Sequence, residues 1–263
     1  MNLRFDILFV EDEKIIVGIA EKILHEAGFS VDAAADAETA FDKWRQNVYR
    51  VLIADLMLPN VSGIELMKRV KMQNPDIPVI IISGYATVEI VIEAFTAGAF
   101  DFLAKPFDEN ELLGVVRRGV TYLDMLKGRP EKSPGFMQEK KHDAEKVYFL
   151  GKHSWTKADE KGLYVVGLGE TFSGVLQEIR EVVFPEIGSE ILQGRSCVRL
   201  VSEQLFEHVV LSPLSGKVVA VDHKLQNESK QKNINLLRRR WLLKLLPTNL
   251  TPELMYLTDA KHD

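Results

Sequence analysis

The first half of the chain contains four short apolar runs, each followed at once by a polar side chain: residues 7–10, 51–54, 79–82 and 102–104. Apolar runs of this length that alternate with helical patterns are typical of strands buried on both faces of a parallel sheet. In such folds the carboxyl ends of the strands meet at one edge, where ligands bind. The pattern therefore constrains this half to an α/β fold with its chemistry at that edge.

Helical patterns separate the apolar runs. Residues 14–27 predict a helix that Gly28 ends, and one face of it carries Ile15, Ile19, Ile23 and Leu24. We expect a short strand at 30–33, a fifth strand at 101–104, and helices at 36–46, from Ser62, at 86–97 and at 108–127. The pairs Ser62/Glu65 and Asp108/Glu111 have capping-box spacing. Five βα units with short connections predict a doubly wound, five-stranded parallel sheet.

The polar residues that follow the runs are those of a phosphoryl-transfer site: Glu11, Asp12, Asp55, Ser83 and Lys105. Clustered carboxylates repel one another unless a cation lies among them, and hard oxygen ligands suit Mg²⁺. A carboxylate can attack a phosphoryl group, while a metal ion and an ammonium group neutralise the charge that develops. A single Asp at a strand end more often caps a helix, but the full set favours Asp55 as a phosphoacceptor. Lys105 is then the ammonium group, and Ser83 can bond a phosphoryl oxygen.

Glu11-Asp12, Asp55, Ser83 and Lys105-Pro106, in this order, resemble the receiver domain of two-component response regulators over roughly residues 3–126. The resemblance implies a flavodoxin-like fold and a cis peptide before the proline. It also implies a Mg²⁺ site formed by Glu11, Asp12, Asp55 and the backbone carbonyl of Met57.

The same resemblance implies a switch formed by Ser83 and Phe102. In the family, phosphorylation draws the hydroxyl toward the phosphoryl group and the aromatic ring turns inward. An aromatic residue on a central strand is more often plain core, so this alternative for Phe102 stays open. The family also implies a sensor histidine kinase as phosphodonor and a phosphorylation-dependent homodimer.

Residues 128–135 have the glycine, proline and charge content of a linker. We therefore expect a receiver domain at 1–127, a linker at 128–146, a second domain at 147–247 and a tail at 248–263, in which 252–257 has a weak helical pattern. The second domain has short β-type runs at 163–168, 174–179, 196–201, 208–211, 217–221 and 241–246. Short strands with glycine turns predict a small barrel or sandwich.

Four motifs carry a second resemblance: the double turn at 184–194, the Ser-Pro turn at 212–218, His153-x-Trp155, and the run at 241–245. Together they resemble the H protein of the glycine cleavage system over about residues 147–247. That resemblance implies a lipoyl-carrier fold, a barrel-sandwich hybrid.

The carrier lysine of that family is missing. Its place on a hairpin tip corresponds to Leu205, and there is no lysine between residues 200 and 216. Leucine has no amine to acylate, so we expect no lipoate. Leu205 and Phe206 instead form a candidate contact patch for an unidentified downstream protein, since aromatic anchors dominate interfaces; the alternative is that both are core. His208 is expected to be an ordinary surface histidine and Cys197 a buried strand residue.

Composition excludes several other classes of protein. The net charge of -5 gives no general attraction to nucleic acid or anionic membranes. The single cysteine excludes an intrachain disulfide, which fits a reducing compartment. There is no signal-type segment at the start, and no apolar run approaches the roughly 20 residues that span a bilayer. We expect a cytoplasmic protein without membrane partners.

DNA binding, a common output of receiver proteins, is not favoured by the second half. Residues 142–247 contain 15 Lys and Arg and 13 Asp and Glu, a net charge of +2, and residues 238–240 form the only basic run. The sequence thus predicts a non-enzymatic response regulator whose second domain signals by protein contact. The alternatives are a lipoyl-type carrier under phosphorylation control and an atypical transcription regulator.

Overall fold

The computed structural model describes residues 3–85, 87–127, 146–176, 178–228 and 241–259. These residues form two compact units, one of Met1–Leu123 with Leu205–His208 and one of Asp124–Gln204 with Val209–Asp263. The expected linker at 128–146 lies outside the described residues except for Lys146, and the basic run at 238–240 lies outside them entirely.

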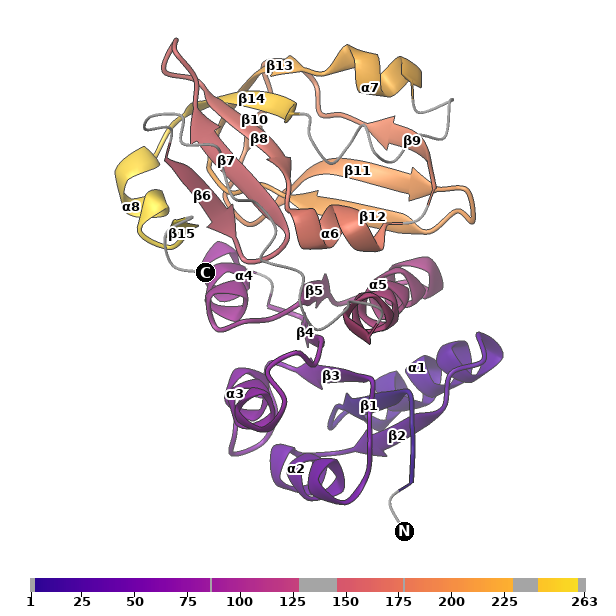
Figure 1. Cartoon of the computed structure of the whole chain (residues 1–263). Helices are drawn as coiled ribbons and strands as arrows, with labels where there is room; N and C mark the ends of the chain where they lie inside the picture. Colours follow the sequence, from indigo (N-terminus) through magenta and orange to yellow (C-terminus); the bar gives the residue numbers. More distant parts are fainter. Residues whose placement is uncertain (1–2, 86, 128–145, 177, 229–240, 260–263) are drawn as a thin grey trace. The chain divides into compact units, whose positions relative to one another are not determined.

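The first unit contains a parallel sheet in the order β2-β1-β3-β4-β5 (Figure 1). Its strands are β1 Ile7–Val10, β2 Val31–Ala34, β3 Val51–Asp55, β4 Val79–Ser83 and β5 Asp101–Ala104. Its helices are α1 Lys14–Glu26, α2 Ala37–Gln46, α3 Gly63–Gln73, α4 Val88–Thr96 and α5 Glu109–Lys127. The predicted doubly wound, five-stranded α/β fold is confirmed.

Each face of this sheet has its own apolar core, because strand side chains alternate between faces. Leu8 and Leu52 belong to the core under α2 and α3, whereas Ile7 and Ile53 belong to the core under α1 and α5. The predicted capping box of Asp108 and Glu111 forms, with each side chain accepting from the other's amide at 2.9 Å. At the predicted Ser62/Glu65 box, Ser62 Oγ caps the helix by accepting from Glu65 N at 3.2 Å.

The predicted apolar face of α1 is only partly buried. Ile15 and Ile19 are 78% and 53% exposed, whereas Ala20 and Leu24 are fully buried. The helix is apolar on two sides, and the sequence does not show which side packs on the sheet.

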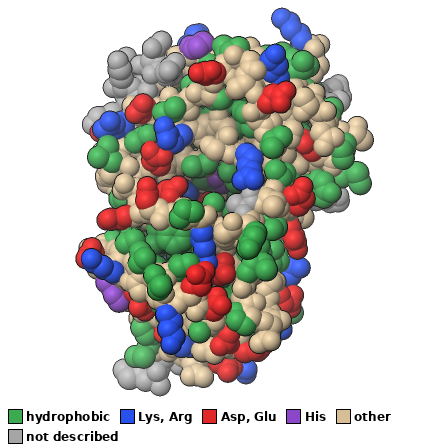
Figure 2. Space-filling view, turned by 180° about the vertical axis from the view of Figure 1, so that it is seen from behind, with side chains coloured by type: hydrophobic (Ala, Val, Ile, Leu, Met, Phe, Trp, Pro, Cys, Tyr) green, Lys and Arg blue, Asp and Glu red, His purple; other side chains and the backbone are tan. Residues whose placement is uncertain are grey.

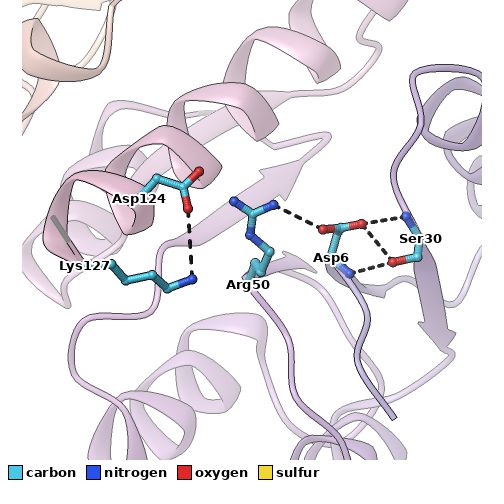
Figure 3. A network of polar contacts seen from close by, with 5 residues as sticks. All are labelled: Asp6, Ser30, Arg50, Asp124 and Lys127. Atoms are coloured by element: carbon cyan, nitrogen blue, oxygen red, sulfur yellow. Dashed lines mark hydrogen bonds and ion pairs between the residues drawn. The ribbon is translucent and has the colours of Figure 1, made fainter.

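The amino-terminal side of the sheet is held by a polar network around Asp6 (Figure 3). Its carboxylate accepts bonds from Ser30 N at 2.9 Å and Ser30 Oγ at 2.8 Å, and Arg50 Nη1 lies 3.3 Å away. Burial raises the pKa of Asp6, but these bonds outweigh it, so the pKa lies below its usual value. The network joins the chain before β1 to the chain before β2 and β3.

The second unit is β-rich, with one sheet in the order β10-β13-β14-β8-β7-β6-β15 and another in the order β12-β11-β9. Its strands are β6 Val147–Leu150, β7 Ser154–Ala158, β8 Tyr164–Leu168, β9 Ile179–Val183, β10 Glu190–Ile191, β11 Ser196–Ser202, β12 Glu207–Leu211, β13 Gly216–Val221, β14 Trp241–Pro247 and β15 Thr258–Asp259. Its short helices are α6 Glu170–Val175, α7 His223–Glu228 and α8 Leu250–Leu254.

Most predicted strands of this unit are confirmed to within one residue, but the strand predicted at 174–179 is wrong. Helix α6 ends at Val175 and β9 begins only at Ile179. Phe172, Val175 and Leu176 are all buried, and their spacing is helical rather than alternating. The weak helical pattern at 252–257 corresponds to α8, which begins earlier at Leu250, and β15 follows it.

The two turn motifs of the second unit bond each other. Gly188 N donates to Val218 O at 2.8 Å, and Gly194 N donates to Ser212 O at 2.7 Å. Both glycines have positive φ, 96° and 72°, a conformation that other residues rarely adopt. The double turn at 184–194 and the Ser-Pro turn at 212–218 therefore form one structural element.

Charged side chains of both signs are interspersed on the face seen in Figure 2. Within the described part of the chain, no helix has the length and apolar composition to cross a membrane.

Candidate phosphoacceptor site

Three carboxylates converge at the carboxyl edge of the parallel sheet. Asp55 is the last residue of β3, and Glu11 and Asp12 follow β1, which pairs with β3. One oxygen atom of each carboxylate lies within 4.8 Å of the others. Asp55 and Glu11 are 5% and 1% exposed, whereas Asp12 is exposed to solvent. The strand ends therefore bring together acidic groups that the sequence separates by more than forty positions.

Lys105 lies among these carboxylates. Its Nζ is 2.5 Å from Glu11 Oε2 and 3.3 Å from Asp55 Oδ1. Its backbone N–H donates to Ser83 O at 2.8 Å, which fixes the residue beyond the end of β5. The peptide between Lys105 and Pro106 is cis. One ammonium group thus faces two buried carboxylates.

The electrostatics of the site favour an added cation. Burial raises the pKa of Asp55 and of Glu11 above their usual values, although Lys105 acts in the opposite direction on both. Burial lowers the pKa of Lys105, but its bond to Glu11 and the charge of Asp55 together raise it above the usual value. Three carboxylates against one ammonium leave a negative site of hard oxygen donors, which fits Mg²⁺.

Ser83 and Phe102 lie on the two neighbouring strands. Ser83 ends β4, is fully buried, and its Oγ accepts a bond from Tyr85 N at 3.0 Å. Phe102 is in β5, is half-buried, and packs against the core under α2 and α3. The hydroxyl is therefore held toward the segment that leads into α4.

The loop after β3 approaches the acidic cluster closely. A Cβ atom on Gly63 would lie 2.2 Å from Asp55 O, so only glycine fits there. For Met57, the expected metal ligand is the backbone carbonyl and not the side chain. The side chain itself is 62% exposed. Sequence reasoning missed Gly63 and also Glu13, whose Oε1 lies 3.8 Å from Lys105 Nζ. The Gly63 signal was its position directly after the helix cap Ser62.

Two family models match the chain. The model for the response regulator receiver domain matches residues 7–117, and the model for the glycine cleavage H-protein matches residues 147–262. The chain combines a receiver domain with a glycine cleavage H-protein domain. Both resemblances expected from the sequence are thereby confirmed. The H-protein match extends through α8 and β15, past residue 247 where the sequence analysis placed the domain end.

Individual relatives cover about half of the chain. The nitrogen assimilation regulatory protein NtrX of Azorhizobium caulinodans is 33% identical over 46% of this chain and 27% of its own length. The response regulator ArlR of Staphylococcus saprophyticus is 34% identical over 48% of this chain and 54% of its own length. The crystal structure of the NtrX receiver domain from Brucella abortus is 33% identical over 44% of this chain and 98% of that chain, with a TM-score of 0.42. The chain thus spans 27–54% of these two curated relatives.

The H-protein domain carries Leu205 at the hairpin turn between β11 and β12. The residue is 53% exposed and has a φ of 68°, and Phe206 beside it is half-buried. His208 is only 4% exposed, so the expectation of a surface histidine is wrong. Cys197 is buried in β11 as expected, and burial raises the pKa of its thiol to about 12.

Proposed function

We propose that this chain is a phosphorylation-controlled response regulator of a two-component system and that Asp55 accepts the phosphoryl group. The observation that carries the proposal is the placement of Lys105 against buried Asp55 and Glu11, beside exposed Asp12. The relatives named above are themselves regulators, and the receiver family model matches the segment that holds this site.

In the proposed reaction, a carboxylate oxygen of Asp55 attacks the phosphorus of a phosphohistidine on a sensor kinase. The new O–P bond gives an aspartyl phosphate as the N–P bond breaks, and the released imidazole takes up a proton. Glu11, Asp12, Asp55 and the backbone carbonyl of Met57 would hold Mg²⁺, which supplies positive charge to the transferred group. Lys105, whose Nζ lies 3.3 Å from Asp55 Oδ1, would supply a second positive charge.

The switch would begin at Ser83. Its hydroxyl hydrogen is available to a phosphoryl oxygen, because its Oγ accepts rather than donates in the bond with Tyr85 N. Movement of Ser83 toward the phosphoryl group would open space on β4 for Phe102 of the neighbouring strand. The movements of Ser83 and Phe102 together would remodel the surface formed by α4, β5 and α5.

The H-protein domain would act as the output module by protein contact, without lipoate. Leu205 at the carrier position supports this, because its side chain has no amine. We propose that the functional boundaries are 1–127 and 147–247, that the tip residues Leu205 and Phe206 form a contact patch, and that the protein acts in the cytoplasm. Phosphorylation-dependent homodimerisation belongs to the same proposal.

Phosphorylation from acetyl phosphate tests the proposed function. Intact mass of the full chain with Mg²⁺ should show one added phosphoryl group, and Asp55→Asn should show none. Asp42→Asn, which alters an exposed carboxylate on α2, is the matched control and should react like the wild type. Equal labelling of Asp55→Asn and the wild type would overturn the proposal.

A further inference from the structure

Lys105 faces a third carboxylate besides those of Glu11 and Asp55. Glu13 Oε1 lies 3.8 Å from Lys105 Nζ, and the side chain of Glu13 is 65% exposed. A separation of this size is near the limit of about 4 Å for an ion pair. Glu13 is not one of the three carboxylates whose oxygen atoms lie within 4.8 Å of one another. The ammonium group therefore has an acidic neighbour that lies outside the candidate metal site.

The carboxylate of Glu13 does not hold the helix that it precedes. Glu13 is the N-cap residue of α1, with φ −78° and ψ 99°, but its side chain makes no capping hydrogen bond. Serine, threonine, asparagine and aspartate are the side chains that usually cap this position. The backbone N–H of Glu13 donates to Glu11 Oε1 at 3.3 Å, which ties the two residues together. The carboxylate of Glu13 is thus left to interact with Lys105.

Glu11 is the main partner of Lys105 in this arrangement. Lys105 Nζ lies 2.5 Å from Glu11 Oε2, closer than to Asp55 or Glu13, and the side chain of Glu11 is fully buried. Charges attract more strongly in buried surroundings than at an exposed position, so Glu11 holds the ammonium more strongly than Glu13 does. Glu11 Oε2 nevertheless has no partner with hydrogen-bond geometry among the described residues. The pair of Glu11 and Lys105 therefore depends on charge and not on directed bonding.

A divalent cation bound at this edge of the sheet would compete with Lys105 for the same carboxylates. Mg²⁺ binds oxygen ligands at about 2.0–2.1 Å and demands near-octahedral geometry. Glu11 and Asp55 are both expected ligands and both neighbours of Lys105. Once they share their charge with a cation they attract the ammonium less, and the cation itself repels it. Of the three carboxylates that pair with Lys105 in the described part of the chain, Glu13 is the one that would keep its full charge.

We propose that Glu13 is a positioning residue, which takes over the ammonium of Lys105 when a divalent cation binds at Glu11, Asp12 and Asp55. The movement required is small, because Glu11 Oε2 and Glu13 Oε1 both lie within about 4 Å of the same nitrogen atom. Lys105 would then remain beside Asp55, where the phosphoryl group arrives, without opposing the cation at Glu11. The inference rests on the proposed function and adds the residue that positions Lys105 during the reaction.

Cation affinity in a double-mutant cycle on the full chain tests this role. Mn²⁺, which like Mg²⁺ suits octahedral oxygen sites, is titrated in, and free Mn²⁺ is measured by electron paramagnetic resonance. Glu13→Gln should weaken Mn²⁺ binding by about tenfold, the lower end of the effect of residues that support metal ligands. In the Lys105→Met background there is no ammonium to position, so Glu13→Gln should change the dissociation constant by less than about twofold.

The cycle separates positioning of Lys105 from simple attraction of the cation. Asp42→Asn, which removes an exposed carboxylate on α2, is the control and should leave Mn²⁺ binding unchanged. An equal loss of affinity in both backgrounds would mean that Glu13 attracts the cation by its own charge, and would overturn the proposal. No loss in either background would overturn it as well.

Carbodiimide cross-linking of the wild-type chain tests the same role without a variant of Lys105. The reagent joins a carboxylate to a lysine amine as an amide with loss of water, and peptide mass spectrometry locates the product. The yield of the amide between Glu13 and Lys105 should rise by at least about fivefold from chelator to Mg²⁺, the lower end of usual coupling effects. The distant ion pair of Lys43 and Asp32 is the internal reference. An unchanged or reduced yield would contradict the proposal.

Labelling with acetyl phosphate distinguishes failure of this inference from failure of the proposed function. If Asp55 accepts phosphoryl groups but Glu13 and Lys105 are not coupled, the positioning role is overturned and the proposed function stands. If Asp55 accepts none, the proposed function fails, and the role of Glu13 is judged by cation binding and cross-linking alone.

Discussion

Replacing Asp55 with asparagine should make the metal-free receiver more stable, although it removes the proposed phosphoacceptor. The carboxylate oxygens lie within 4.8 Å of one another, and at that limit and an effective dielectric constant of about 20 each pair of unit charges repels by about 3.5 kcal/mol. Opposite charges 3.3 Å apart, as between Asp55 and Lys105, attract by about 5 kcal/mol. Repulsion by Glu11 and Asp12 thus exceeds attraction by Lys105 by about 2 kcal/mol. Solvent screens the charge of exposed Asp12, which weakens its repulsion of Asp55. Replacing the buried carboxylate with a neutral amide also removes the cost of burying a charge. We therefore expect Asp55→Asn to stabilise the receiver by about 1–2 kcal/mol.

The direction agrees with the raised pKa of Asp55, because that shift means that the folded protein disfavours the ionised carboxylate. Added Mg²⁺ should reverse the ranking, since it stabilises the wild type by about 1.4 kcal/mol at ten times its dissociation constant. Asp55→Asn, with one ligand fewer, should gain less.

Urea titration read by hydrogen exchange of β1 and β3 peptides measures the free energy of unfolding of the first unit alone. It is run at neutral pH with a chelator and again with Mg²⁺, and Asp42→Asn is the matched control. A less stable Asp55→Asn in chelator, or an equal Mg²⁺ gain in both proteins, would refute the electrostatic reasoning.

Two further predictions concern other parts of the chain. Leu205→Gly should favour the positive-φ turn and stabilise the protein by about 1 kcal/mol in urea unfolding; a loss of stability would contradict the conformational argument. Asp6→Ala should cost about 1–2 kcal/mol at neutral pH. Because the pKa of Asp6 is lowered in the folded protein, the difference in unfolding free energy between the wild type and Asp6→Ala should vanish as the pH falls through this pKa. A difference that persists in acid would contradict the role given to the ionised carboxylate.

The receiver half was largely predictable because the residues of its site lie at or directly after the ends of the strands. A buried parallel strand is a short apolar run, and the residue after it reaches the sheet edge whatever the helices between do. Asp55, Glu11 and Lys105 could therefore be brought together from the order of runs alone. The identity of the buried face of α1 could not, because Ile15 and Ile19 have the same spacing as Ala20 and Leu24.

The second half was less predictable because its elements depend on distant partners. Strands β10 and β15 have two residues each and exist only through pairing with β13 and β6. Helix α6 lies in a short segment whose few apolar residues fit the spacing of a helix as well as that of a strand.

The measurement that tests the central claim most directly is mapping of the phosphorylated residue. The chain is treated with acetyl phosphate and Mg²⁺, reduced with borohydride to convert an aspartyl phosphate to homoserine, and analysed by peptide mass spectrometry. Homoserine at position 55, dependent on Mg²⁺ and absent from Asp55→Asn, is the predicted result. Reduction at another aspartate with Asp55 unchanged, or labelling that Asp55→Asn retains, would contradict the assignment of Asp55 as the phosphoacceptor.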